Sequence, residues 1–192
     1  ASTVIMSAML ETTFMLCSTI STVRLADTPE NQEAFPQSPS QKAGTGFPVM
    51  KIVALFCIAG GAILGHAVGN LWNSELSLVA QLLSALSPQD VLIADRGFCN
   101  YALAALLGKK QVAVIARVPT TVRKIDFRKG QKRLGPKDAL FVWTQPKARC
   151  PWLSMDQWLG LPQTLTVRVL RVRVRLPGVR VRELTLMTTL LD

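Results

Sequence analysis

The stretch "VLIADRGFCNYALAALL", residues 91–107, decides the fold prediction. Four apolar residues run into Asp95 and Arg96, a glycine follows, and a second apolar stretch begins. The short first run is typical of a buried strand, and the longer run, followed by Gly108, predicts a helix. Asp95 is then either a turn or cap residue or a member of a functional site, because open α/β sheets gather their sites at the carboxyl ends of strands.

The flanking segments extend this strand and helix into an α/β pattern. Sequence patterns predict strands at 13–25, 49–59, 62–68, 90–94 and 111–118, helices at 75–86 and 98–107, and a long polar loop at 26–48. Three early strands followed by alternating helix and strand is the element order of an RNase H-like mixed sheet with helices. We predict two regions, an RNase H-like region at 13–118 and a basic β-rich region at 119–192.

Charge is distributed unevenly between the two halves. Residues 1–108 carry four basic residues against seven acids, a balance of −3, and residues 109–192 carry 18 against five, a balance of +13. This asymmetry predicts a polyanionic partner for the second half, with double-stranded DNA favoured over an anionic membrane surface.

Cysteine spacing and hydropathy disfavour zinc-binding, disulfide-rich and membrane-spanning proteins. The four cysteines lie far apart, and His66 is the only histidine, which disfavours a zinc site or a disulfide framework and favours the reducing cytoplasm. Residues 52–69 contain no Asp, Glu, Lys or Arg, but 18 residues is short for a membrane span. Gly60-Gly61 at the centre favours a β-hairpin there, so we expect no membrane span.

Two basic segments are candidate DNA contacts. Residues 121–137 predict a basic loop or ragged hairpin, and residues 164–191 give the densest strand signal, with arginines alternating with valines on both sides of Pro177-Gly178. We expect a bulge near 169–170, with Arg175 opposite Arg180 and Arg173 opposite Arg182. This arginine row is either a solvated strand face or a phosphate-binding surface. The candidate DNA-binding residues are Arg123, Lys124, Arg128, Lys129, Lys132, Arg133, Arg171, Arg173, Arg175, Arg180 and Arg182.

Three segments together carry a family resemblance. These are "LADTPENQEAFPQSPSQKAGTGFPVMKIVALF", "DVLIADRGFCNYALAALL" and "DFRKGQKRLG". In this order they resemble bacterial insertion-sequence transposases of the IS-four family with a DDE catalytic domain, over residues 21–192. The resemblance implies DNA transposition by an RNase H-like nuclease that binds two divalent metals, Mg²⁺ or Mn²⁺, through an Asp, Asp, Glu triad. It implies that Asp95 is the second acid, both a catalytic residue and a metal ligand. It also implies that residues 13–118 are a partial RNase H-like transposase core and that residues 119–192 are the basic β-rich insertion region that such transposases carry between their second and third acids.

The sequence departs from the family pattern at two places. An Asp-Gly pair precedes Thr-Val in the family, whereas this chain has Thr19 and Ile20 there. Asp27 is eight residues farther along, about 26 Å in an extended strand, and cannot easily replace the first acid. The family's glutamate lies in a helix with a Tyr-Arg-Glu-Lys signature beyond the Thr-Thr-Leu-Leu-Asp at 188–192. We expect Glu183 to be a charge partner for neighbouring arginines instead of that glutamate.

The sequence therefore predicts a truncated, catalytically incomplete piece of a transposase. Metal binding is expected to be weak, because one carboxylate holds Mg²⁺ poorly. The full-length family implies a homodimer and a place at the bacterial nucleoid. A non-catalytic DNA-binding remnant is the alternative from another functional class, and a membrane-surface protein is the third.

Overall fold

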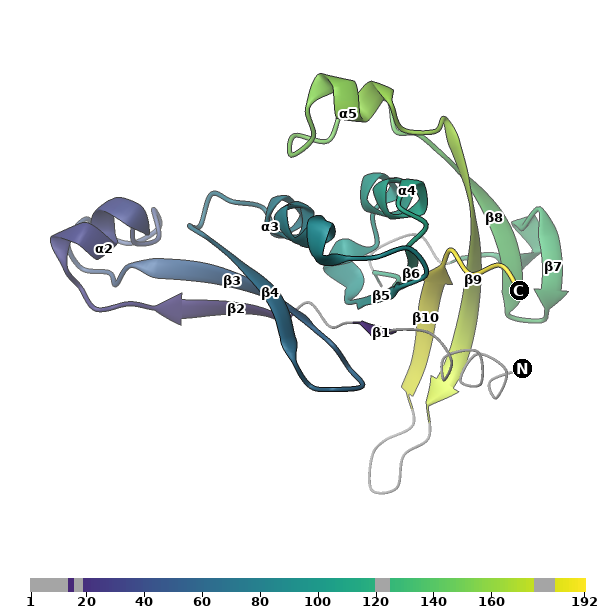
Figure 1. Ribbon diagram of the computed structural model, residues 1–192, viewed down its shortest axis with the longest axis horizontal. Coiled ribbons are helices and arrows are strands. Elements are labelled where there is room, and N and C mark those ends of the chain that lie inside the picture. The colour runs from purple at the N-terminus through teal and green to yellow at the C-terminus, as the bar shows by residue number, and fades with distance from the viewer. Residues whose placement is uncertain (1–13, 16–18, 120–124, 175–181) are drawn as a thin grey trace.

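The computed structural model describes residues 14–15, 19–119, 125–174 and 182–192 (Figure 1). The strands in this part of the chain are β1 (Phe14–Met15), β2 (Thr19–Arg24), β3 (Val49–Phe56), β4 (Ile63–Gly69), β5 (Val91–Ala94), β6 (Ala113–Arg117), β7 (Lys132–Gly135), β8 (Asp138–Thr144), β9 (Thr164–Val174) and β10 (Arg182–Thr188). The α-helices are α2 (Pro29–Ala34), α3 (Glu75–Leu82), α4 (Tyr101–Lys109) and α5 (Met155–Leu159), and short 3-10 turns lie at Leu83–Ala85, Arg96–Phe98 and Phe127–Lys129.

Two sheets organise the chain. The larger has the order β1-β5-β6-β10-β9-β8-β7, in which β1, β5 and β6 are parallel and the remaining neighbours are antiparallel. The smaller is the antiparallel sheet β2-β3-β4. The chain passes from β1 in the larger sheet to β2 in the smaller one, so three early strands adjoin a parallel β1-β5-β6 unit. This confirms the predicted α/β class and its RNase H-like order.

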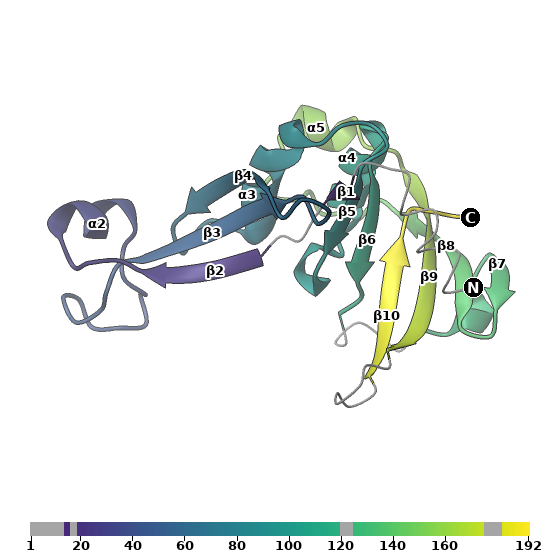
Figure 2. The ribbon, with the colours of Figure 1, turned by 60° about the horizontal axis from the view of Figure 1, so that its bottom comes forward.

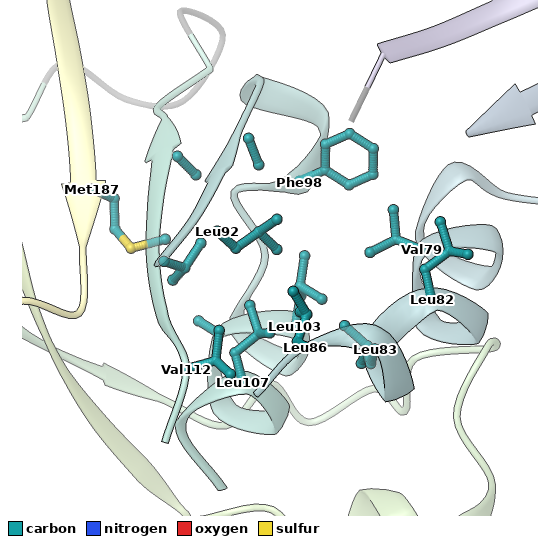
Figure 3. Close-up of a cluster of buried hydrophobic side chains, with 14 of the residues drawn as sticks. Val79, Leu82, Leu83, Leu86, Leu92, Phe98, Leu103, Leu107, Val112 and Met187 are labelled. Carbon is teal, nitrogen blue, oxygen red and sulfur yellow. The ribbon is translucent and has the colours of Figure 1, made fainter. Parts of the chain in front are cut away.

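Helices α3 and α4 cover one side of the strands, as Figure 2 shows. Ser74 accepts a hydrogen bond from the Ser77 N–H and begins α3, and Asn100 does the same for the Ala102 N–H and begins α4. The apolar sides of both helices join the inward residues of β3, β5, β6 and β10 in one core (Figure 3). Its fully buried members include Val53, Leu78, Leu92, Phe98, Leu103, Leu107, Val114 and Met187.

The opposite face of the larger sheet is less covered. Ile93 lies opposite Ile115 across β5 and β6, and both are only half-buried, as are Leu184 and Leu186 of β10. Leu92, Ala94, Val114, Ala116 and Met187, which point toward the helices, are buried. The face toward the helices is therefore packed more completely than the other face, on which Val91, Leu170 and Thr188 are nevertheless buried. The larger sheet also runs through both predicted regions without a break, because β10 pairs with β6. The boundary at residues 118 and 119 stays a prediction.

The local differences from prediction have simple causes. The expected loop at 26–48 contains helix α2, because Thr28 accepts a hydrogen bond from the Asn31 N–H and Pro29 has the fixed φ of a first helical residue. The expected helix at 98–107 is displaced: Arg96–Phe98 forms a 3-10 turn, and α4 continues through Gly108 to Lys109.

The uncharged stretch at 52–69 forms the β3–β4 hairpin, as predicted. Gly61, in the turn, has φ of +66°, a conformation that glycine adopts at little cost. Among the residues that the structure describes, no helix is long and apolar enough to span a membrane.

Candidate active site and nucleic-acid interface

Asp95 follows β5 directly and stands at the start of the Arg96–Phe98 turn. The backbone closes this turn, since the Phe98 N–H donates to the Asp95 carbonyl at 3.0 Å. The Asp95 side chain makes no capping hydrogen bond and is exposed. Asp95 is therefore a turn residue, as one of the two interpretations expected, but its carboxylate does not cap the turn; its membership in a functional site stays a prediction.

Two contacts fix the position of this turn. The Phe98 ring is almost completely buried among α3, α4 and the sheet (Figure 3). On the outer side, a Cβ added to Gly97 would lie 3.1 Å from the Glu75 carboxylate at the start of α3. A side chain at position 97 would therefore require the Glu75 carboxylate to move by a few tenths of an ångström. The sequence analysis missed Glu75, because nothing in the sequence links α3 to the Asp95 turn.

The structure places Thr19 at the beginning of β2, opposite Ala54 of β3. The side chain of Thr19 lies outside the described part of the structure. Asp27 lies beyond the far end of β2, where its carboxylate accepts a hydrogen bond from the Gln32 side-chain amide at 2.7 Å. This bond belongs to the structure around α2, in agreement with the expectation that Asp27 does not replace the first acid.

The residues described here do not fit a two-metal site. Within residues 14–15, 19–119, 125–174 and 182–192, no three His, Cys, Asp or Glu side chains converge closely enough to hold a metal ion. Mg²⁺ keeps its water shell unless carboxylates or phosphates replace part of it. Asp95 alone supplies one such ligand, so no catalytic step through a metal ion can be derived from this geometry.

An apolar hollow has a volume of about 290 Å³, and one of its lining residues, Cys99, follows the Asp95 turn in the sequence. Cys99, Val118, Phe141, Trp143 and Val169 contribute to its lining. Burial raises the pKa of the Cys99 thiol to about 11, so this thiol is protonated at neutral pH. The hollow therefore offers apolar contact and no nucleophile.

The candidate DNA-binding residues divide between the two faces of the larger sheet. Arg133 lies opposite Ala139, which lies opposite Val169, so Arg133 shares a face with Arg171 and Arg173 farther along β9. Lys132 points to the other face. Arg123, Lys124, Arg175 and Arg180, and the side chain of Arg182, lie outside the described part of the structure.

The Phe127–Lys129 turn extends the face that carries Arg133. The Arg171 guanidinium lies over the Phe127 ring, 5.5 Å from its centroid, which places the turn on this face. Arg128 and Lys129, in the same turn, are exposed. Five of the predicted residues therefore form one surface, called the basic face from here on: Arg128, Lys129, Arg133, Arg171 and Arg173.

The predicted pairing of the arginine hairpin is wrong by one residue. Arg173 lies opposite Glu183, and Arg182 lies opposite Val174. The observed pairing brings Arg173 within 3.2 Å of the Glu183 carboxylate, which also receives Lys137 at 3.1 Å. Opposite charges face each other across the strands instead of like charges, which favours this register. Lys137 and Arg173 lower the pKa of Glu183, the charge partner that the sequence analysis expected.

The expected bulge near 169–170 is also wrong, since β9 pairs without interruption with both β8 and β10. Val169 points into the core, and Leu170 is buried on the other face. Arg168 shares that second face, where its guanidinium donates two hydrogen bonds to the Asp138 carboxylate, at 3.0 and 2.7 Å. An ion pair therefore explains the sequence at 168–170 without a bulge.

Asp95 and the basic face reach the same edge of the larger sheet. Strands β5 and β6 are parallel, and β10 is antiparallel to β6, so the start of β10 and the end of β9 lie beyond the carboxyl ends of β5 and β6 (Figure 2). Ala94, Ala116, Met187 and Val169 form one row across these four strands. Arg171 and Arg173 therefore extend past the level of Asp95, at a lateral distance of about 14 Å, or three strand spacings. We call this edge the Asp95 edge.

Comparisons with known proteins agree on one family. The model of the transposase DDE domain matches residues 21–175, a span that includes Asp95 and begins two residues after Thr19. The chain is 28% identical over 153 residues to transposase InsG for insertion sequence element IS4 of Escherichia coli K12. That match covers 78% of this chain and 32% of InsG, so the chain spans about a third of the length of this relative.

A solved structure also resembles the chain. It is the piggyBac transposase synaptic complex with hairpin DNA, which matches 94% of this chain and 34% of its own chain. The TM-score is 0.48 and the sequence identity is 12%.

Proposed function

Because the chain belongs to the transposase DDE domain family, we propose that it is the part of a DNA transposase that carries the second catalytic acid, Asp95, and a phosphate-binding surface beside it. The observation that supports this most is the Asp95 edge. An exposed carboxylate without a capping role and the ends of two arginine-bearing strands lie along one side of one sheet. A duplex lying across this edge would meet both.

The basic face suits phosphate more than base recognition. Arg128 is paired with Asp126, and Arg173 with Glu183, so part of the positive charge is already compensated. Lys129, Arg133 and Arg171 form no ion pair within the described residues, and we assign them the main phosphate contacts. Such contacts position a duplex without reading its sequence.

Fluorescence anisotropy tests the partner class. Three duplexes of unrelated sequence should bind with dissociation constants that agree within a few-fold. In a separate sedimentation assay at the same salt concentration, the protein should not co-sediment with vesicles of anionic phosphatidylserine. Vesicle binding with little DNA binding would support the membrane-surface alternative instead. A DNA-bound role implies association with the bacterial nucleoid.

For the chemistry, we propose that the chain binds Mg²⁺ or Mn²⁺ weakly and does not cleave DNA on its own. This rests on Thr19 at the position of the family's first acid and on the lack of converging carboxylates among the described residues. The alternative is a DNA-binding remnant without any metal chemistry. A Mn²⁺ titration followed by electron paramagnetic resonance distinguishes it from the transposase site. Weak Mn²⁺ binding that is lost in Asp95→Asn favours the transposase site, and equal binding by both proteins favours the remnant.

A plasmid-nicking assay with Mg²⁺ or Mn²⁺ tests the absence of cleavage. We expect no nicking by the parent or by Asp95→Ala. Nicking by the parent that disappears in Asp95→Ala would show that another acid completes the site.

A further inference from the structure

Exposed apolar side chains concentrate on the β3–β4 hairpin and the turn after it. Of the large hydrophobic residues with high exposure, Ile58, Ile63, Leu64, Val68 and Trp72 fall within 15 consecutive residues. Trp72, with 67% of its surface exposed, and Ile63, with 64%, are among the most exposed of them. Exposed apolar side chains that gather in one part of a protein often mark an interaction site, whereas single ones scattered over the surface do not.

The outer side of β4 is an open sheet edge. In the order β2-β3-β4, no strand within the described residues pairs with its free side. At one end of β3 the Cys57 N–H donates to the Ala62 carbonyl, and at the other end the Pro48 carbonyl accepts from the Leu25 N–H. The peptide groups of odd-numbered residues in β3 therefore point toward β4, and those of even-numbered residues point toward β2. Val53 lies opposite Ala67, and Ala54 opposite His66. The peptide groups of His66 and Val68 therefore point away from β3, toward the open edge.

The edge strand of the larger sheet shows what is unusual about β4. Strand β7 has four residues and carries Lys132 and Arg133, a short and charged edge of the kind that prevents pairing with other chains. Strand β4 has seven residues, and residues 52–74 contain no Asp, Glu, Lys or Arg. The chain as a whole has a formal charge of +10, yet this edge offers no charge that would repel a second copy.

We propose that β4 pairs with β4 of a second copy of this chain in antiparallel orientation, with the two-fold axis at Ala67. His66 of each copy then lies opposite Val68 of the other, and their outward peptide groups exchange four N–H···O hydrogen bonds. Ala67 lies opposite Ala67, where a small side chain permits close approach. The two three-stranded sheets become one six-stranded sheet, and the Val68 side chain packs beside His66 of the other copy. This inference is independent of DNA binding and of Asp95.

The β-bulge on β4 limits how far this pairing extends. The register between β3 and β4 shifts between Leu55 and Phe56, whose partners are Gly65 and Ile63, so Leu64 is the extra residue. A bulge interrupts pairing on its strand. The shared ladder is therefore confined to the segment 65–69, which is why we place the axis at Ala67 instead of nearer the hairpin turn.

Sedimentation equilibrium of the full chain tests the proposal, with Val68→Lys as the disrupting variant. Val68 is 44% exposed, so a lysine there is tolerated by the monomer, whereas a lysine on an edge strand disfavours its pairing with another strand. We expect a monomer–dimer equilibrium in the parent and a dissociation constant at least about tenfold higher in Val68→Lys, equivalent to about 1.4 kcal/mol. Val142→Lys is the matched control, because Val142 is a strand valine of similar exposure, 42%, in the other sheet.

Amide hydrogen exchange supplies the second measurement. The His66 and Val68 amides should exchange more slowly as parent concentration rises, and their exchange should not depend on concentration in Val68→Lys. DNA binding measured on the same proteins should be unchanged, which separates this inference from the proposed function. A parent that is monomeric at every concentration, or a control that dissociates as much as Val68→Lys, would overturn the β4 pairing.

Discussion

The Asp95 turn and the strands β8–β10 differ in whether their carboxylates form ion pairs. In β8–β10 and the turn before them, Asp138 pairs with Arg168, Glu183 with Arg173 and Lys137, and Asp126 with Arg128. At Asp95 the side chain forms no capping bond, and the described residues offer it no ion pair. Acids in the basic region are thus charge partners of arginines and lysines, whereas the Asp95 carboxylate has no charge partner among the described residues.

The largest expected effect is on the support of the Asp95 turn. Phe98→Ala removes a ring that is 1% exposed and leaves a cavity between α3, α4 and the sheet. We expect a loss of about 3–5 kcal/mol in the free energy of unfolding, measured by urea denaturation. Phe47→Ala, at a ring that is 54% exposed, is the control and should change stability little. Equal losses in both variants would mean that Phe98 does not anchor the turn.

The second effect probes the paired side of the comparison. Asp138→Ala leaves the Arg168 guanidinium, which is 11% exposed, without its carboxylate. We expect a loss of about 2–3 kcal/mol, below the 3–5 kcal/mol of fully buried pairs because both side chains keep some contact with water. Asp126→Ala removes an exposed ion pair with Arg128 together with the hydrogen bond that Asp126 accepts from the Arg128 N–H, and it should cost less stability than Asp138→Ala. A negligible loss in Asp138→Ala would remove the distinction between buried and exposed pairs.

The third effect is smaller and tests the contact between α3 and the turn. In Gly97→Ala the new methyl group would meet the Glu75 carboxylate at 3.1 Å, so Glu75 must move by a few tenths of an ångström. We expect a destabilisation of up to about 1 kcal/mol. The same substitution in a Glu75→Ala background should cost less, and a double-mutant cycle of thermal unfolding measures that coupling. Additive effects would show that Glu75 does not restrict the space for a side chain at position 97.

Much of the fold could be predicted because local patterns determined it. Alternating apolar residues identified β9 and β10, and Gly60-Gly61 identified the β3–β4 turn. Helix α2 was missed because it buries no side chain and so has no apolar periodicity; it depends on its Thr28 cap and first-turn proline.

The sites were less predictable because they depend on contacts between distant residues. The register of β9 and β10 is consistent with Glu183 meeting both Arg173 and Lys137, and Lys137 is 46 residues away in the chain. The Arg168–Asp138 pair, 30 residues apart, produces a sequence pattern that resembles a bulge. The role predicted for Asp95 rests on the family resemblance and on the position of the acid at a strand end, whereas the approach of Glu75 to the same turn could be seen only in the structure.

The salt dependence of DNA binding tests most directly whether the basic face beside Asp95 holds DNA. With about six phosphate contacts, log K of the parent should fall against log salt concentration with a slope near −5. Serine at Lys129, Arg133 and Arg171 should make the slope shallower by about 2.7, since each contact contributes about 0.9. Serine at Arg24, Lys42 and Lys147, which removes the same charge elsewhere, should leave the slope close to that of the parent. Equal slopes for the parent and the basic-face variant, or an equal change in the control, would contradict the account.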